Sequence, residues 1–183
     1  MEIDVLGWPP DGPTLRLDHE RFSYAGKFVM SNTGKAVARD GGEIVAAVAF
    51  NEDRTDAERL WLRYVTVARE RRGEGIGPRL IAVVRDRAVA RGYGRLRIAV
   101  NNPYAYEALS RVGFRYTGET TGIAELILEF RADESGRASG AGRAIDPDRY
   151  REGLAAFRGR DLSEEERTFL ENYLERGPPT RLE

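Results

Sequence analysis

The spacing of apolar residues along the chain predicts strands alternating with helices. Two β-rich runs, 35–39 and 43–50, flank Asp40-Gly41-Gly42 and are typical of a hairpin with a short turn. A third β-rich run covers 60–67. Beyond a glycine-containing loop, the helical spacing of apolar residues predicts a helix with one buried stripe, formed by Ile76, Leu80, Val83, Val84 and Ala88.

The rest of the first 131 residues continues this alternation. Strands are expected at 96–100, from Gly113-Phe114 onward and at 123–130, with a helix at 103–111. Near the N-terminus, a short strand at 14–17 and a helix from Asp18 toward Met30 are expected, while the first residues show no regular period. The predicted fold class is therefore α/β of the α+β type, with a mixed, mostly antiparallel central sheet and helices on both faces.

Composition divides the chain into three parts. Residues 1–131 are expected to form the main domain, and 132–145, rich in Gly, Ser, Ala and Arg, are typical of a flexible linker. Residues 146–183 are predicted to form a C-terminal helical hairpin, because Asp146-Pro147 and Ser163-Glu-Glu-Glu166 are helix-start signals.

The predicted hairpin has more apolar side chains than two isolated short helices would leave exposed. We expect it to pack on its own domain or on a second copy of the chain in a homodimer. The alternative is a lid over an acceptor groove or a contact for another protein.

Charge and residue content exclude several classes of function. The net charge of −1 over 183 residues gives no general attraction to nucleic acid or to an anionic membrane. Because the chain has no cysteine and His19 is the only histidine, no thiolate or histidine metal cluster is expected. No apolar run approaches the ~20 residues that cross a bilayer. We therefore expect a cytoplasmic protein with no metal and no nucleic-acid or membrane partner.

The loop from Arg72 to Gly77 is the strongest candidate for a binding site. A glycine-rich turn between a strand and a helix is a general anion site, because the first helical N–H groups lack intrahelical partners. The alternative is a tight turn without a ligand. A dinucleotide fingerprint would need glycine at Pro78 or Leu80, and the chain lacks the Gly-Lys-Ser/Thr of a nucleoside-triphosphate loop.

Two motifs give this loop a family resemblance. Val65-Thr66-Val67, followed by Arg72-Gly73-Glu74-Gly75-Ile76-Gly77, resembles the acetyl-CoA motif of the GNAT superfamily of N-acetyltransferases, Arg/Gln-x-x-Gly-x-Gly/Ala. Asn102-x-x-Ala105, followed by Gly113-Phe114, is similar to a second motif of that superfamily. The resemblance covers about residues 14–130.

The resemblance implies a donor, a reaction and a set of roles. Backbone groups of Val65, Thr66 and Val67 would pair with the pantetheine arm of acetyl-CoA, and the amides of 73–77 would hold its pyrophosphate, with Arg72 beside it. Asn102 would help to seat the coenzyme where the two middle strands of the sheet splay apart. The implied reaction is direct transfer of acetyl to a primary amine on a small molecule or a protein. The alternative is a CoA-binding regulatory module with little or no catalysis.

Departures from the family pattern leave the acid and base open. Pro78 has no N–H to donate to a phosphate. Leu109 stands at the position where the family has a tyrosine that is proposed to protonate the leaving thiolate. Arg97 stands at the position where relatives that acetylate protein N-termini have a glutamate that acts as general base. Tyr106, on a neighbouring face of the same helix, is the candidate acid, with a packing role as the alternative. Weaker candidates for acid or base are Tyr104, Tyr64, Glu125, Glu58 and His19.

Overall fold

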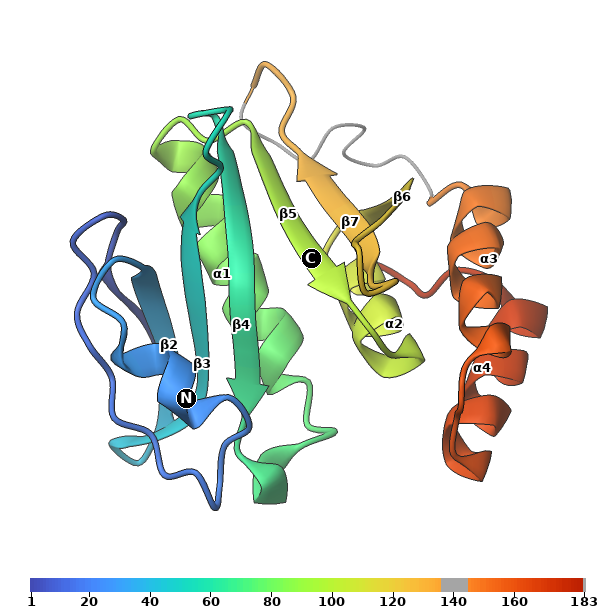
Figure 1. Ribbon diagram of the computed structural model, residues 1–183, viewed down its shortest axis with the longest axis horizontal. Coiled ribbons are helices and arrows are strands. Elements are labelled where there is room, and N and C mark those ends of the chain that lie inside the picture. Colours follow the sequence, from blue (N-terminus) through green and yellow to red (C-terminus); the bar gives the residue numbers. More distant parts are fainter. Residues whose placement is uncertain (136–144, 183) are drawn as a thin grey trace. The chain divides into compact units, whose positions relative to one another are not determined.

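The computed structural model describes residues 1–135 and 145–182, which contain seven strands and four α-helices (Figure 1). The chain forms two compact units, Met1–Leu96 and Arg97–Glu183. The predicted α+β class with mostly antiparallel strands is confirmed, whereas the splaying of the middle strands stays a prediction. Most of the predicted linker lies outside the described residues.

Four strands build the sheet of the first unit: β1 (Glu2–Gly7), β2 (Gly34–Asp40), β3 (Glu43–Glu52) and β4 (Arg59–Val67). They lie in the order β1-β2-β3-β4, and each neighbouring pair is antiparallel. The predicted hairpin is confirmed: Asp40 pairs with Glu43 around Gly41 and Gly42, which both have positive φ. β1 is an additional strand that we did not predict.

Helix α1 (Ile76–Ala90) packs on β2, β3 and β4, as Figure 1 shows. The predicted stripe is confirmed except at Val83, which is only half-buried, and Ile81 is buried in addition. The helix therefore covers one face of this sheet with aliphatic side chains, and its first turn contains the last two residues of the glycine loop, Ile76 and Gly77.

The predictions for residues 14–30 were wrong in secondary structure. Residues 14–17 form no strand, and the expected helix is replaced by turns and a short 3-10 helix, η1 (Ala25–Val29). Locally, Asp18 Oδ1 accepts the N–H of Glu20 at 2.9 Å, and Tyr24 has a left-handed backbone with φ 61°, which interrupts a right-handed helix. Phe28 is nevertheless fully buried, packed with Val37 of β2 and with Ala47 and Ala49 of β3.

The second unit contains β5 (Arg95–Val100, which begins at the end of the first unit), α2 (Pro103–Arg111), β6 (Arg115–Thr120) and β7 (Leu126–Arg131). The strand order is β5-β7-β6, and Arg115 of β6 pairs antiparallel with Glu129 of β7. The predicted helix 103–111 is confirmed. The last strand begins at Leu126 rather than at 123, because residues 121–124 form a turn in which Ala124 has φ 63°.

The C-terminal hairpin consists of α3 (Pro147–Ala155), the 3-10 helix η3 (Ala156–Gly159) and α4 (Glu164–Arg176). Both predicted caps are confirmed: Asp146 accepts the N–H groups of Asp148 and Arg149, and Ser163 accepts that of Glu166. The hairpin packs on α2 and β6 of its own unit. In the described residues, no helix is both long and apolar enough to span a membrane.

Candidate functional site

The glycine loop connects β4 to α1 through the 3-10 turn η2 (Arg69–Arg71). Gly73 has φ 85° and Gly75 has φ 73°, and Gly75 is the N-cap of α1 without a side-chain cap. Both backbone conformations are in the left-handed region that favours glycine. The two glycines therefore set the path by which the chain enters the helix.

The backbone N–H groups of this loop are open to a ligand. Among the described residues, none of the N–H groups of residues 73–77 donates to a protein acceptor, and a Cβ added at Gly73 or Gly75 would meet no atom within 4 Å. The dipole of α1 adds partial positive charge at this end. The geometry therefore fits a phosphate or pyrophosphate group, which such helix starts bind.

The backbone groups of Val65 and Val67 lie on the side of β4 that faces away from β3. The N–H of Ala68 donates to the carbonyl of Val45 in β3 at 2.8 Å. In an antiparallel strand, the backbone N–H and C=O groups of successive residues point alternately to the two neighbouring strands. The backbone groups of Thr66 therefore also point toward β3, whereas those of Val65 and Val67 point away from it. Of the three residues predicted to pair with pantetheine, Val65 and Val67 direct their backbone groups away from β3 and Thr66 directs its groups toward it; the pairing itself stays a prediction.

Charges around the loop are arranged to favour an anion. Arg71 pairs with both Glu74 and Asp40 at 2.9 Å, and the hydrogen bonds that it donates to these carboxylates raise the pKa of Arg71. The Glu74 carboxylate, which lies inside the glycine loop, is thereby neutralised. Arg72 contacts only neutral acceptors, Ser23 Oγ at 2.9 Å and the Val67 carbonyl at 3.4 Å, within the described residues. Its positive charge stays available beside the loop.

Asn102 has a structural role in the second unit. It is the N-cap of α2, and its Oδ1 accepts the N–H of Ala105 at 2.9 Å. This bond explains why an Asn-x-x-Ala pattern begins the helix. Its Nδ2 donates to Asn101 Oδ1 at 3.1 Å. The role in seating the coenzyme stays a prediction.

Tyr106, the candidate acid, is 1% exposed. Its hydroxyl donates to the carbonyl of Tyr150 at 3.0 Å, and its ring lies 6.0 Å from that of Phe157. Burial is the main cause that raises the pKa of Tyr106, so the phenol holds its proton more firmly than usual. Leu109, at the family's acid position, is also buried. These contacts favour the packing interpretation of Tyr106 over the catalytic one.

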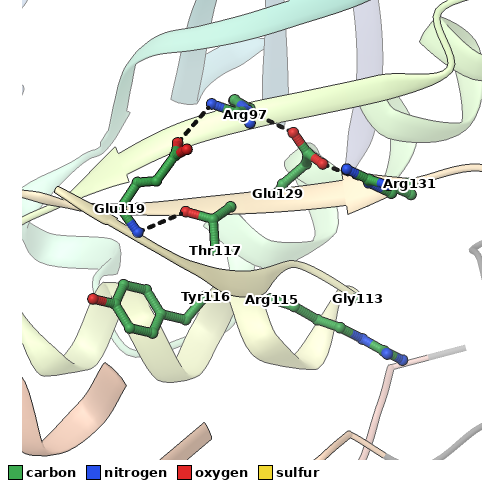
Figure 2. A pocket seen from close by; sticks show the side chains of 8 residues that line it. All are labelled: Arg97, Gly113, Arg115, Tyr116, Thr117, Glu119, Glu129 and Arg131. Carbon is green, nitrogen blue, oxygen red and sulfur yellow. Dashed lines mark hydrogen bonds and ion pairs between the residues drawn. The ribbon is translucent and has the colours of Figure 1, made fainter. Parts of the chain in front are cut away.

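Arg97 belongs to an ion-pair network that the sequence analysis missed (Figure 2). Its Nε donates to Glu129 at 2.5 Å and its Nη1 to Glu119 at 3.1 Å, while Arg131 donates to Glu129 at 2.7 Å. Burial raises the pKa of Glu129, but the hydrogen bonds from Arg131 and Arg97 outweigh it, and the pKa is lowered overall. The network lines an open hollow of about 340 Å³ over β5, β6 and β7.

The other candidates are scattered. Tyr64 lies half-buried on β4, its ring 5.8 Å from that of Tyr24, and Tyr104 packs on Phe169 at 4.5 Å. His19, Glu58 and Glu125 are at different surface positions. Within 1–135 and 145–182, no group of three or more acidic or histidine side chains is arranged to hold a metal ion. Within the first unit, the structure brings the glycine loop against the end of β4, where Arg72 Nε lies 3.4 Å from the Val67 carbonyl.

Comparison with known proteins gives the family. Residues 2–114 match the profile described as the acetyltransferase (GNAT) family. No protein of curated function matches. Among solved structures, yncA of Salmonella typhimurium, solved with its cofactor acetyl-CoA, superposes with a TM-score of 0.51 at 16% identity, over 56% of this chain and 66% of that one.

Two further structures are similar. The ribosomal-protein-alanine N-acetyltransferase of Brucella melitensis has a TM-score of 0.49 at 20% identity, over 54% of this chain and 68% of that one. The paiA N-acetyltransferase of Thermoplasma acidophilum, in complex with coenzyme A, has 0.47 at 17%, over 53% and 59%. Identities this low concern the fold alone, whereas the profile match spans more than half of the sequence. The chain therefore belongs to the GNAT acetyltransferase family.

Proposed function

We propose that this protein transfers an acetyl group from acetyl-CoA to a primary amine by direct attack. The observation that carries the proposal is the run of backbone N–H groups at residues 73–77 that donate to no acceptor among the described residues, at the start of α1 and shortly after Val65 and Val67 of β4. A site for two phosphates beside a strand edge is the arrangement that a nucleotide with an extended amide-containing arm requires.

The binding roles follow from the contacts. The amides of 73–77 would hold the pyrophosphate, and Arg72 would add a positive charge beside them. Arg71 supports this binding indirectly, because its ion pair with Glu74 removes a negative charge that would repel phosphate. Backbone groups of Val65 and Val67 would pair with the pantetheine amides.

Acetyl-CoA supplies a thioester whose carbonyl carbon an amine can attack. The N–H of Val65 or Val67 would donate to the carbonyl oxygen, where negative charge develops as the carbon–nitrogen bond forms. The carbon–sulfur bond then breaks, the nitrogen loses one proton, and the departing sulfur takes one up. Holding the two reactants in line contributes much of the rate, so the chain needs no covalent intermediate.

We assign no side chain to the proton transfers. Tyr106 donates its hydrogen bond to Tyr150 and is enclosed, and Leu109 has no proton to give. Water at the open site is the donor and acceptor that we propose.

The second candidate is a CoA-binding regulatory module with little catalysis. Two residues of α2 favour this candidate. The Tyr106 hydroxyl is buried and bonded to Tyr150, and Leu109 has no acidic group, so neither can protonate a leaving thiolate.

Release of free CoA with a panel of primary amines separates the two candidates. An enzyme will release CoA faster with at least one amine than by hydrolysis alone. If acetyl-CoA binds but no amine raises the release above hydrolysis, the regulatory module is the better account.

A further inference from the structure

A shallow hollow of about 560 Å³ opens in the first unit, lined by residues 22–27 together with His19 and Arg69. Three lining residues are basic, and none is acidic. The Lys27 and Arg69 side chains are exposed. The hollow therefore has a positive potential that favours an anionic group.

The pairing of neighbouring arginines makes this charge distinctive. Arg21 pairs with Glu70 at 2.6 Å, and Arg71 pairs with Glu74 and Asp40. Within the part of the chain that the structure describes, neither Lys27 nor Arg69 forms an ion pair with a carboxylate. Arg21 and Arg71 thus take up Glu43, Glu70, Asp40 and Glu74, while Lys27 and Arg69 in the lining are left for another partner; Asp18 and Glu20, which flank His19, do not line the hollow.

An aromatic wall stands beside these cations. Tyr24 is 54% exposed although its backbone has φ 61°, a conformation that is unfavourable for a residue with a Cβ. Its ring lies 5.8 Å from that of Tyr64 on β4, and the Lys27 ammonium lies 5.8 Å from the Tyr64 ring. Residues with a strained backbone cluster at ligand-binding and active sites, and the exposed ring of Tyr24 is available for such a contact.

Arg72 connects this hollow to the proposed coenzyme site. It bridges Ser23, in the lining, and the carbonyl of Val67, at the end of β4. The same side chain thus touches the hollow and the end of β4, where Val67 is one of the two residues whose N–H is proposed to polarise the thioester carbonyl.

We propose that the hollow binds an anionic group of the acceptor: the acceptor is an amine that also has a carboxylate or a phosphate, and Lys27 and Arg69 bind that group. This inference rests on the proposed acetyl transfer. A site of this kind would distinguish anionic amines from neutral ones.

Matched amines test the substrate class. Phosphoethanolamine is compared with ethanolamine, and 3-aminopropanoate with propylamine, by acetyl-CoA-dependent CoA release. The wild type should prefer the anionic member of a pair, and the double variant Lys27→Met with Arg69→Met should raise its KM roughly tenfold or more. Arg87→Met, an exposed arginine in the last turn of α1, is the matched control and should leave KM unchanged. Equal rates within both pairs would overturn the proposal.

The coenzyme's own 3′-phosphate is the competing occupant. If the double variant weakens acetyl-CoA but not its 3′-dephospho form, the hollow binds the coenzyme and the proposal is overturned.

A binding measurement separates failure of the site from failure of the chemistry. If no amine releases CoA, the proposed transfer fails, and amide NMR with phosphoethanolamine still reports on the hollow. Shifts at residues 19–27 that the double variant loses would support the anion site, and unmoved signals in the wild type would overturn it.

Discussion

The hydroxyl of Tyr106 in α2 donates a hydrogen bond of 3.0 Å to the backbone carbonyl of Tyr150 in α3. Both residues are at least 98% buried, so this bond lies inside the interface that joins the C-terminal hairpin to α2. The hydrogen bond therefore gives Tyr106, the buried tyrosine of α2, a packing role. It also holds the hairpin against α2 of its own unit.

Tyr106→Phe tests that assignment. We expect the free energy of unfolding to fall by about 1 kcal/mol, the usual net value of one hydrogen bond, while turnover stays close to that of the wild type. Tyr104→Phe is the control, because Tyr104 is 42% exposed and should change stability by less than about 0.5 kcal/mol. Urea unfolding and steady-state rates measure the two effects. A large loss of turnover with an altered pH–rate profile would restore Tyr106 as the acid.

Gly153 tests how closely α3 packs on α2. A Cβ at this position would lie 2.3 Å from the Tyr106 hydroxyl oxygen and 2.8 Å from Tyr116 Cδ1. Gly153→Ala should therefore destabilise the protein by about 1–3 kcal/mol, although alanine favours a helix. Gly159→Ala, where nothing lies within 4 Å, should not destabilise it. Thermal unfolding that shows a gain at Gly153 would contradict the packing.

Asp53 should make the first unit sensitive to acid. The N–H of Thr55, at 2.8 Å, and Trp61 Nε1, at 2.7 Å, donate to its carboxylate and hold its pKa well below the ordinary value. A lowered folded-state pKa contributes stability above the unfolded pKa of about 3.9, and this stability is lost as the pH falls below that value.

Asp53→Asn should lower stability at neutral pH and flatten its decline below about pH 4. Melting temperatures across the acid range measure this, and equal declines in both proteins would contradict it.

The two glutamates that pair with Arg97, Glu129 and Glu119, should contribute differently to the free energy of unfolding. Glu129→Gln leaves a nearly buried cation short of a partner and should cost about 1–3 kcal/mol. Glu119, whose side chain is 60% exposed, should contribute less than about 1 kcal/mol. Chemical denaturation of Glu129→Gln and Glu119→Gln compares them, and equal costs would contradict the burial of this pair.

Most elements of the fold follow from local sequence signals. The α1 stripe, the hairpin around Gly41-Gly42 and the caps at Asp146 and Ser163 each depend on neighbouring residues, so periodicity and capping chemistry predict them. The helix expected from Asp18 stops after one turn: the N–H of Phe22 donates to the Asp18 carbonyl at 2.9 Å, but Tyr24 has φ 61°, which interrupts the right-handed path.

The candidate site was predictable only in part. The spacing of the glycines in residues 73–77 predicts an anion site, because all the residues that form it lie in one short segment. The Arg97–Glu129 pair joins residues 32 positions apart, and only the pairing of strands brings them together. From the sequence alone, the charge of Glu74 is expected to repel a phosphate. The structure shows that Arg71 pairs with this carboxylate and neutralises it.

Acetyl-CoA affinity, measured by titration calorimetry on Gly75→Val and Gly41→Val, tests the central claim most directly. Both glycines have positive φ and open space around them, so valine strains the backbone at both. Only Gly75 lies where a phosphate would approach the amides. The account predicts that Gly75→Val weakens acetyl-CoA binding at least about tenfold, which is ~1.4 kcal/mol, while Gly41→Val binds like the wild type. Equal affinity in the two folded variants would contradict the pyrophosphate site.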